Sequence, residues 1–318
     1  MGGGSGGQGA KEFLDEIGEE VYKEVKKEAD DTAKKYIEEL KGNLASSSIW
    51  KESASTTDPC KLDYTKVING SGSGGAARGD PCTNLSRKVE PRFSNTLGGQ
   101  CTDSKMRSGG KGACAPYRRL HLCHHNLETI NNTTSTTSDT LLAEVCYAAK
   151  EEGESLKGYY GKYDAEHHDF GSTICTVLAR SFADIGDIVR GKDLFLGNTY
   201  ESAQRKQLDE NLKKIFGKIY NEVTNGELKA RYGSDAPYYY QLREDWWYAN
   251  RATVWKAITC GTHKGDTYFR PTCNSSDTKG PSQAHDKCRC DDNPNTDPPT
   301  YFDYVPQYLR WFEEWAED

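Results

Sequence analysis

Eleven cysteines in 318 residues limit the possible folds of this chain more than any other feature. They stand at scattered spacings and not in repeated Cys-x-x-Cys pairs, a pattern that favours a disulfide framework formed in an oxidising compartment. Because the count is odd, one thiol stays unpaired within the chain or pairs with sequence beyond Asp318. The framework is expected to use Cys60, Cys82, Cys101, Cys114, Cys123, Cys146, Cys175, Cys260, Cys273, Cys288 and Cys290.

The composition is that of a polar chain with room for its own core. The length of 318 residues predicts two or more subdomains, and the mean hydropathy is -0.84. The 48 acidic and 41 basic residues give a net charge of -7, which argues against nucleic-acid binding because such proteins usually carry a basic stripe. The sequence shows no secretory hydrophobic region and no apolar run of membrane-spanning length. Any export is therefore expected to be specified elsewhere or unconventionally.

Apolar residues at intervals of four predict amphipathic helix in residues 11–41. We expect one or two helices there, ended by Gly42. A single apolar stripe has no core of its own, so it is expected to lie against the body of the protein. The stripe consists of Phe13, Ile17, Val21 and Val25, and it is extended by Leu14, Ala29, Ala33, Ile37 and Leu40.

Four further helices are predicted from residue 141 onward, which suggests a helical bundle. Residues 261–300 are rich in Pro, Gly, Asp and Cys, and they separate the last of these helices from another that begins at Tyr301. The apolar residues with helical spacing include Leu142 and Val145; Ile174, Phe182 and Val189; Leu212, Phe216 and Ile219; and Leu242, Trp246 and Val254.

The segment ACAPYRRLHLCHHN, residues 113–126, contains residue types that bind zinc or act in catalysis. Adjacent histidines cannot readily share one tetrahedral ion, and the cysteine spacings here and in Cys288-Arg-Cys290 do not match zinc sites. A Cys/His protease needs a reduced nucleophile, which a disulfide framework disfavours. We therefore predict neither a metal nor a cofactor nor an enzyme, and we expect His124 and His125 on a helix or loop surface.

Arg118 and Arg119 in the same segment have two interpretations. Guanidinium groups match sulfate or carboxylate bidentately, so the pair is a candidate anion clamp. Between two cysteines, the same residues are equally candidates for buried structural arginines. The tripeptide Arg78-Gly79-Asp80 resembles an integrin ligand, although a plain turn is the simpler interpretation.

Five long blocks follow one another along the chain: RFSNTLGGQC, GACAPYRRLHLCHHNLE, SFADIGDIVRGKDLFLG, LREDWWYANRATVWKAITC and VPQYLRWFEEWAED. In this order they resemble the consecutive blocks of the Duffy-binding-like alpha domain. Residues 11–50 resemble the N-terminal segment that precedes that domain. The domain heads the erythrocyte membrane protein family that Plasmodium falciparum displays on infected red cells.

The resemblance implies a mainly α, disulfide-stapled Duffy-binding-like fold, with a helical bundle subdomain and a loop-rich mixed subdomain. The family's domain continues past WFEEWAED with a further cysteine, so the partner of the eleventh cysteine is expected outside this chain. The resemblance also implies a structural role for Arg118 and Arg119, which are expected to brace the wall of the subdomain. The implied division is an N-terminal segment at 1–45, the loop-rich subdomain at 46–140, the helical subdomain at 141–300 and the start of a third subdomain at 301–318.

The function that the resemblance implies is adhesion to host cells, through cytoadhesion or rosetting. The expected partners are heparan sulfate-like or blood-group glycans on host cells or a receptor protein, together with an adjacent domain of the same protein and antibodies. The module is expected on the extracellular side of the infected host cell, with its membrane anchor outside this chain. Anionic glycans would need basic residues clustered by folding. The candidates are Lys105, Arg107 and Lys111 in the loop SKMRSGGK, and Lys213, Lys214 and Lys218 on one helix.

The main alternative is a structural scaffold. Such a domain carries immune-variable loops and presents an adjacent receptor-binding domain without a ligand of its own. Lys213, Lys214 and Lys218 are then an ordinary solvated helix face.

Overall fold

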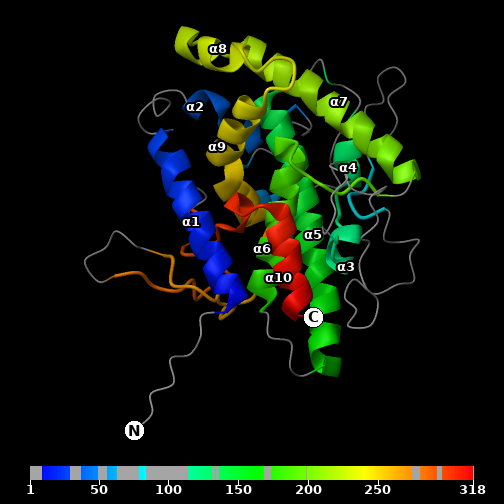
Figure 1. The fold of residues 1–318 in the computed structure, drawn as a ribbon, viewed down its shortest axis with the longest axis vertical. Coiled ribbons are helices and arrows are strands. Elements are labelled where there is room, and N and C mark those ends of the chain that lie inside the picture. The colour runs from blue at the N-terminus through cyan, green and yellow to red at the C-terminus, as the bar shows by residue number, and fades with distance from the viewer. Residues whose placement is uncertain are drawn as a thin grey trace.

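Helices make up most of the described part of the chain in the computed structural model, so the prediction of a mainly α fold is confirmed (Figure 1). The structure describes residues 9–28, 37–48, 56–62, 79–83, 114–130, 133, 136–167, 173–197, 199–273, 280–291 and 296–317. The α-helices are α1 (Ala10–Glu28), α2 (Ile37–Leu40), α3 (Tyr117–Leu120), α4 (His125–Glu128), α5 (Ser138–His167), α6 (Ile174–Arg190), α7 (Thr199–Glu222), α8 (Gly226–Gly233), α9 (Tyr240–Ile258) and α10 (Gln307–Glu317). Short 3-10 helices are η2 (Leu44–Ser46), η3 (Pro59–Lys61) and η6 (Phe302–Tyr304).

The centre of the fold is the bundle of α5, α6 and α9 (Figure 1). Almost every residue of α6 is buried, because α5, α9, η6 and α10 all pack against it. The backbones of α5 and α9 approach closely at Gly153, where an added Cβ would lie 2.0 Å from the carbonyl oxygen of Ile258. Any larger side chain at this position would push the two central helices apart.

Aromatic side chains fill the space between α6 and α9. The ring centroid of Phe182 lies 5.1 Å from that of Trp247 and 5.2 Å from that of Trp255. The indole N–H of Trp247 donates to Asp303, and that of Trp255 donates to the carbonyl of Cys288. Both buried indoles therefore keep a hydrogen-bond partner, which is the condition for burying tryptophan at low cost.

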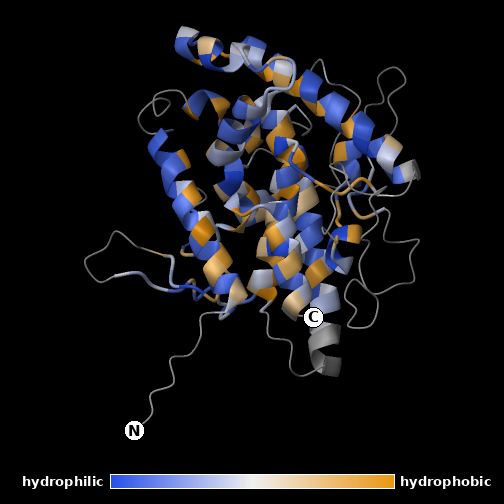
Figure 2. Cartoon of the chain, in the orientation of Figure 1, coloured by the Kyte–Doolittle hydropathy of each residue, from blue (hydrophilic) through white to orange (hydrophobic). Residues whose placement is uncertain are grey.

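The helices α7 and α8 lie across one end of the central bundle (Figure 1). They carry hydrophilic residues over much of their length (Figure 2). The apolar side of α7 is buried against the core through Leu212, Phe216 and Ile219, as the helical spacing predicts. The opposite side of α7 is consequently available to solvent.

Disulfides join segments that are distant in the sequence, which confirms the disulfide-stapled fold. Within the described residues, Cys60–Cys260 links η3 to the end of α9, and Cys175–Cys288 links the start of α6 to the segment after α9. Cys114 is also disulfide-bonded, Cys146 is a free buried thiol, and Cys101 lies outside the described residues. The remaining described pairs are Cys82–Cys123 and Cys273–Cys290.

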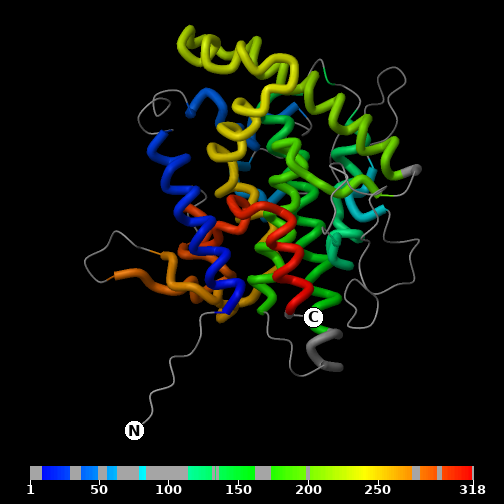
Figure 3. Tube along the Cα trace, in the orientation of Figure 1, coloured from blue at the N-terminus to red at the C-terminus, as the bar shows by residue number. Residues whose placement is uncertain are grey.

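The N-terminal helix docks on the body through a face that overlaps the predicted one only in part, since Leu14 of the extended stripe is buried. α1 packs beside η6 and α10, so the two ends of the described chain lie together (Figure 3). Phe13 is 55% exposed and Val21 is 39% exposed, so the expectation that the stripe as a whole lies against the body is wrong. Ile17 and Val25 are only partly buried. The buried residues of α1 are Leu14, Asp15, Gly18 and Tyr22.

Polar and close-packed contacts explain this orientation of α1. The Asp15 carboxylate accepts hydrogen bonds from the backbone N–H of Tyr301 at 2.8 Å and from Arg270 Nη1 at 2.6 Å. The Tyr22 ring lies 5.1 Å from the Tyr301 ring. Gly18 faces the Tyr301 carbonyl oxygen, which would lie 2.3 Å from an added Cβ. A buried carboxylate and a glycine contact leave no trace in apolar periodicity, so the pattern indicated the neighbouring face.

The docking of α1 is expected to depend on pH through Asp15. Burial raises the pKa of Asp15 to about 6, although its bonds from Tyr301 and Arg270 act in the opposite direction. The pKa of Asp15 is therefore higher in the folded state than in the unfolded state, so the docked helix favours the protonated carboxyl group. The docking free energy that protonation of Asp15 contributes is lost as pH rises through about 6. Docking of α1 should therefore become stronger as the pH is lowered from about 7 to about 5.

Hydrogen-exchange protection of the α1 amides, corrected for the intrinsic rate, measures this effect. Asp15→Asn should remove most of the pH dependence because the amide does not titrate in this range. The neighbouring Glu19 should not produce the same effect: burial raises its pKa, but hydrogen bonds from Arg270 and Lys23 outweigh burial and hold the pKa below its ordinary value of 4.5. Equal protection at both pH values in the unaltered protein would contradict the prediction.

Candidate functional site

The two arginines of the segment YRRL are buried in an ionic network. Arg118 donates to Asp184 at 2.7 Å and to Glu314 at 2.8 Å, which joins α3 to α6 and α10. Arg119 pairs with Asp193 at 2.6 Å. Because both guanidinium groups already face buried carboxylates, neither is placed to clamp an external anion.

The same network includes residues from the last helix. Arg310 donates to Asp184 at 2.8 Å and to Asp187 at 2.6 Å, and the Gln307 side chain donates to Asp184 at 3.0 Å. Burial raises the pKa of Asp184, but Arg118 and Arg310 outweigh burial and hold it well below its usual range. The blocks containing YRRL, FADIGDIVR and PQYLRWFEEW thus meet inside the protein and build its frame.

His124 is buried, so the prediction that it lies on a helix or loop surface is wrong. Its Nδ1 lies 2.7 Å from the carbonyl oxygen of Leu122, and its Nε2 lies 2.7 Å from Arg205 Nη2. Burial and the charge of Arg205 lower the pKa of His124, whereas Glu128, whose Oε1 lies 3.0 Å from Nε2, acts in the opposite direction. His125 is partly exposed and lies 3.2 Å from Glu128. These contacts arise from tertiary packing, which the local sequence does not report.

The Arg-Gly-Asp tripeptide is only partly described, and its described part forms a turn. The Asp80 carboxylate accepts from the backbone N–H of Cys82 at 2.8 Å, and the Asp80 carbonyl accepts from Thr83 Oγ1 at 2.8 Å. These bonds favour the plain turn over an integrin ligand. The remaining predicted residues in this part of the chain lie outside the described residues; they are Arg78, Lys105, Arg107 and Lys111.

The other three predicted basic residues lie on α7. Lys213 pairs with Glu210 at 2.7 Å, and Lys218 pairs with Glu222 at 3.3 Å. Lys214 is exposed. Since two of these lysines already face carboxylates of their own helix, α7 presents mixed charge and not a basic stripe.

Two exposed tyrosines, Tyr238 and Tyr240, lie near Lys213, and neither was among the residues predicted from the sequence. Tyr238 and Tyr240 are 45% and 46% exposed, and their rings are stacked with centroids 5.6 Å apart. Lys213 Nζ lies 4.6 Å from the Tyr238 centroid, and the Arg243 guanidinium lies 5.9 Å from the Tyr240 centroid. Asp209 pairs with both cations, at 3.6 Å and 3.4 Å. The run YYY was the only signal, and its exposure depends on the turn before α9.

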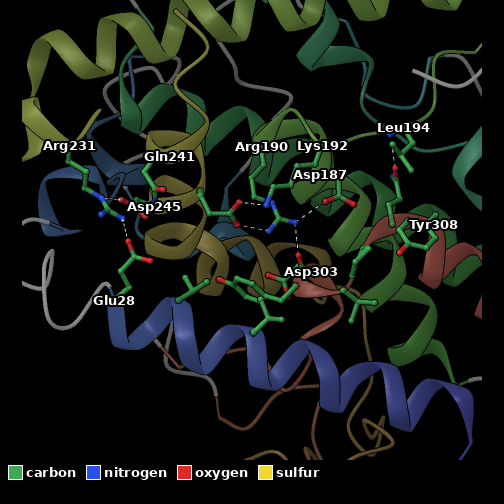
Figure 4. Close-up of a pocket in the computed structure, with 17 residues that line it drawn as sticks. Glu28, Asp187, Arg190, Lys192, Leu194, Arg231, Gln241, Asp245, Asp303 and Tyr308 are labelled. Carbon is green, nitrogen blue, oxygen red and sulfur yellow. Dashed lines mark hydrogen bonds and ion pairs between the residues drawn. The ribbon is translucent and has the colours of Figure 1, made fainter. Parts of the chain in front are cut away.

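A pocket of about 480 Å³ lies between α1 and the body of the protein (Figure 4). We call it the α1 pocket and define it by Val21 and Val25 of α1 on one side and Leu194, Tyr304 and Tyr308 on the other. Its volume is within the range of small-ligand and peptide pockets, about 300 to 1,000 Å³.

The described residues offer neither a metal centre nor a membrane-spanning helix. No group of three or more His, Cys, Asp or Glu side chains in that part of the chain is arranged to hold a metal ion. None of the described helices combines the length and the apolar character needed to cross a membrane.

The structure is a disulfide-stapled helical frame in which the motif arginines are buried in ion pairs, whereas Lys214, Tyr238 and Tyr240 are exposed. Residues 112–310 match the Duffy binding domain, and residues 9–48 match the N-terminal segments of PfEMP1. The chain belongs to the Duffy binding domain family, as a PfEMP1 N-terminal segment followed by a Duffy-binding-like alpha domain. The resemblance noted in the sequence is thereby confirmed.

Solved structures of the family are similar over nearly the whole chain. The NTS-DBL1-alpha and CIDR-gamma double domain of PfEMP1 from Plasmodium falciparum varO strain is 34% identical with a TM-score of 0.75, over 97% of this chain and 43% of that one. The ICAM-1-binding PfEMP1 IT4var13 DBLbeta domain is 27% identical with a TM-score of 0.66, over 95% of this chain and 62% of that one.

Curated relatives are more distant and much longer. The Duffy receptor of Plasmodium vivax (strain Salvador I) is 26% identical over 162 residues, which are 48% of this chain and 12% of the receptor. The Duffy receptor beta form of Plasmodium knowlesi is 24% identical over 65% of this chain and 14% of its own length. This chain therefore corresponds to a small part of each receptor. The family is one of binding and adhesion domains.

Proposed function

We propose that this chain is a host-cell adhesion module of a variant surface antigen on infected red cells. The proposal rests on family membership: the proteins similar to this chain include a Duffy receptor and an ICAM-1-binding domain. The module contacts host glycans or a receptor protein on the extracellular side. The adjacent domain of the same protein and antibodies are its further partners.

The arrangement of residues supports a separation between frame and contact surface. Arg118 and its ionic partners are buried, so they stabilise the frame and leave recognition to exposed residues. We define the α7 surface as Lys213, Lys214, Lys218, Tyr238 and Tyr240. Preorganised, exposed tyrosines are typical of protein contact sites, whereas lysines paired with carboxylates attract a polyanion weakly. The α7 surface therefore fits a receptor protein better than a sulfated glycan.

An array of host glycans and receptor ectodomains, probed with the folded chain, tests the proposal. Binding to a receptor that is lost in the Tyr238→Ala, Tyr240→Ala double variant supports the α7 surface. The structural scaffold is the alternative, and the burial of the motif residues is compatible with it. A scaffold without its own ligand binds nothing on the array.

Heparin retention is expected to depend on the loop SKMRSGGK more than on α7. Neutralising Lys105, Arg107 and Lys111 together should weaken retention, and raised salt should do the same because screening acts over about 8 Å at physiological ionic strength. The matched control neutralises Lys213, Lys214 and Lys218 and should have the smaller effect, since Lys213 and Lys218 are already paired. Equal losses in both triple variants, or retention insensitive to salt, would refute this assignment.

A further inference from the structure

The buried ring of His124 has a hydrogen-bonding group beside each of its nitrogens. Nδ1 lies 2.7 Å from the carbonyl oxygen of Leu122. A carbonyl oxygen can only accept, so Nδ1 carries a proton whatever the charge of the ring. Nε2 lies 2.7 Å from Arg205 Nη2 and 3.0 Å from Glu128 Oε1. The charge of His124 is therefore decided at Nε2 alone.

The two contacts of Nε2 exclude each other. A guanidinium group only donates, so Arg205 needs the free lone pair of an unprotonated Nε2. A carboxylate only accepts, so Glu128 needs a proton on the same nitrogen. Neutral His124 consequently binds Arg205, and protonated His124 binds Glu128. One proton taken from solvent onto Nε2 exchanges one partner for the other.

Both partners of Nε2 keep their charge near neutral pH. Burial raises the pKa of Glu128, but His124 and Arg205 outweigh burial and hold this pKa at about 2. Burial and the charge of Arg119 lower the pKa of Arg205 to about 10. The charged and titratable groups around this site are Arg119 and His121 at α3, His125 and Glu128 on α4, Glu201 and Arg205 on α7, and Asp193 in the segment after α6.

Two side chains of α7 tie that helix to the segment around α4. Arg205 does so through His124, and Asn211 does so by donating to the carbonyl of Ile130 at 2.8 Å. When His124 is protonated, Arg205 Nη1 still has Asp193 at 2.6 Å, but Nη2 loses its acceptor and faces a like charge. Asn211 does not titrate, so only the part of α7 that precedes it loses a contact.

We propose that His124 is an acid-sensitive switch that holds the first half of α7 against α4 when neutral and releases it when protonated. Burial and Arg205 lower the pKa of His124 below its ordinary value of 6.5 while α7 is held. The contact is therefore complete above about pH 6.5 and is lost as the pH falls below that value. The switch does not depend on the adhesion function proposed above.

Hydrogen exchange of the amides of residues 201–210, corrected for the intrinsic rate, measures the release of this half of α7. Opening should become about 3- to 25-fold more frequent when the pH is lowered from about 7 to about 5. The upper limit applies to a histidine that titrates at about 6.5 in the released helix and not at all in the held one. The amides of residues 212–222, beyond Asn211, should change less. Equal protection at both pH values, or an equal change along all of α7, overturns the proposal.

A second measurement needs no variant. The chemical shift of the Nε2 nitrogen of His124, followed by NMR, reports whether this nitrogen carries a proton. Nε2 should be unprotonated at about pH 7, with a titration midpoint below about 6.5. A proton on Nε2 at about pH 7, or a midpoint above about 6.5, overturns the proposal.

Variants then assign the effect to His124. His124→Gln offers Arg205 an acceptor oxygen but does not titrate, so the pH dependence of residues 201–210 should disappear. The matched control is His125→Gln, which changes the neighbouring histidine and should keep that dependence. Glu128→Gln removes the carboxylate that binds protonated His124, so release should need a lower pH. A pH dependence that persists in His124→Gln, or that vanishes in His125→Gln, overturns the proposal.

Discussion

Asp184→Ala is expected to lower the free energy of unfolding by about 3 to 5 kcal/mol, the usual loss when one partner of a buried ion pair is removed. One carboxylate oxygen of Asp184 accepts from Arg118 at 2.7 Å, and the other accepts from Arg310 at 2.8 Å and Gln307 at 3.0 Å. Without it, two buried guanidinium groups lose a countercharge at once. Denaturant unfolding without reductant measures the change.

The matched control for Asp184 is Glu210→Ala. Glu210 also pairs with a cation, Lys213, but its side chain is exposed, so the expected loss is below about 1 kcal/mol. Arg118→Met tests the bracing role of that arginine and should lower stability on the scale of Asp184→Ala. If Asp184→Ala costs no more than Glu210→Ala, the network does not stabilise the frame.

Acid should remove the contribution of Asp184. The pKa of Asp184 is lower in the folded state than in the unfolded state. Asp184 therefore contributes to the free energy of unfolding above the unfolded-state pKa of about 3.8, and this contribution is lost only as the pH falls below that value. Asp15 acts in the opposite direction near pH 6, because its folded-state pKa is raised. The frame and the docked helix are thus expected to respond to acid with opposite sign.

The frame could be predicted from the sequence to a useful extent. Helical spacing indicated α5, α6, α7 and α9, and scattered cysteines indicated a disulfide framework, because both patterns follow directly from local chemistry. The predicted division into subdomains at residues 45, 140 and 300 stays a prediction. The residues alone left Arg118 and Arg119 ambiguous, and only the family resemblance assigned them a bracing role, since their partners lie on α6 and α10 and in the segment after α6.

The contact surfaces could not be predicted in the same way. Tyr238 and Tyr240 stack only because a turn places them side by side next to Lys213. The α1 pocket requires two ends of the chain to meet. The face of α1 was predicted only in part, because Asp15 and Gly18 make close docking contacts and neither contributes to apolar periodicity.

Gly18→Leu is expected to release α1 from the body. The new Cβ would lie 2.3 Å from the carbonyl oxygen of Tyr301, a backbone atom that cannot turn aside, and 3.0 Å from a methyl group of Val305. The helix must therefore move out, and Asp15 then loses its bonds from Tyr301 and Arg270. Helix propensity alone predicts the reverse, since Leu is about 0.7 to 1 kcal/mol better than Gly in a helix interior.

Limited proteolysis decides between these two effects. Cleavage within residues 10–28 should become at least about 30-fold faster in Gly18→Leu, which corresponds to a loss of about 2 kcal/mol of docking free energy. Val21→Leu is the matched control on an exposed position of the same helix and should leave cleavage unchanged. Slower cleavage in Gly18→Leu would mean that the gain in helix propensity outweighs the clash with the Tyr301 carbonyl. The close approach of Gly18 to Tyr301 would then contribute little to holding α1 in place.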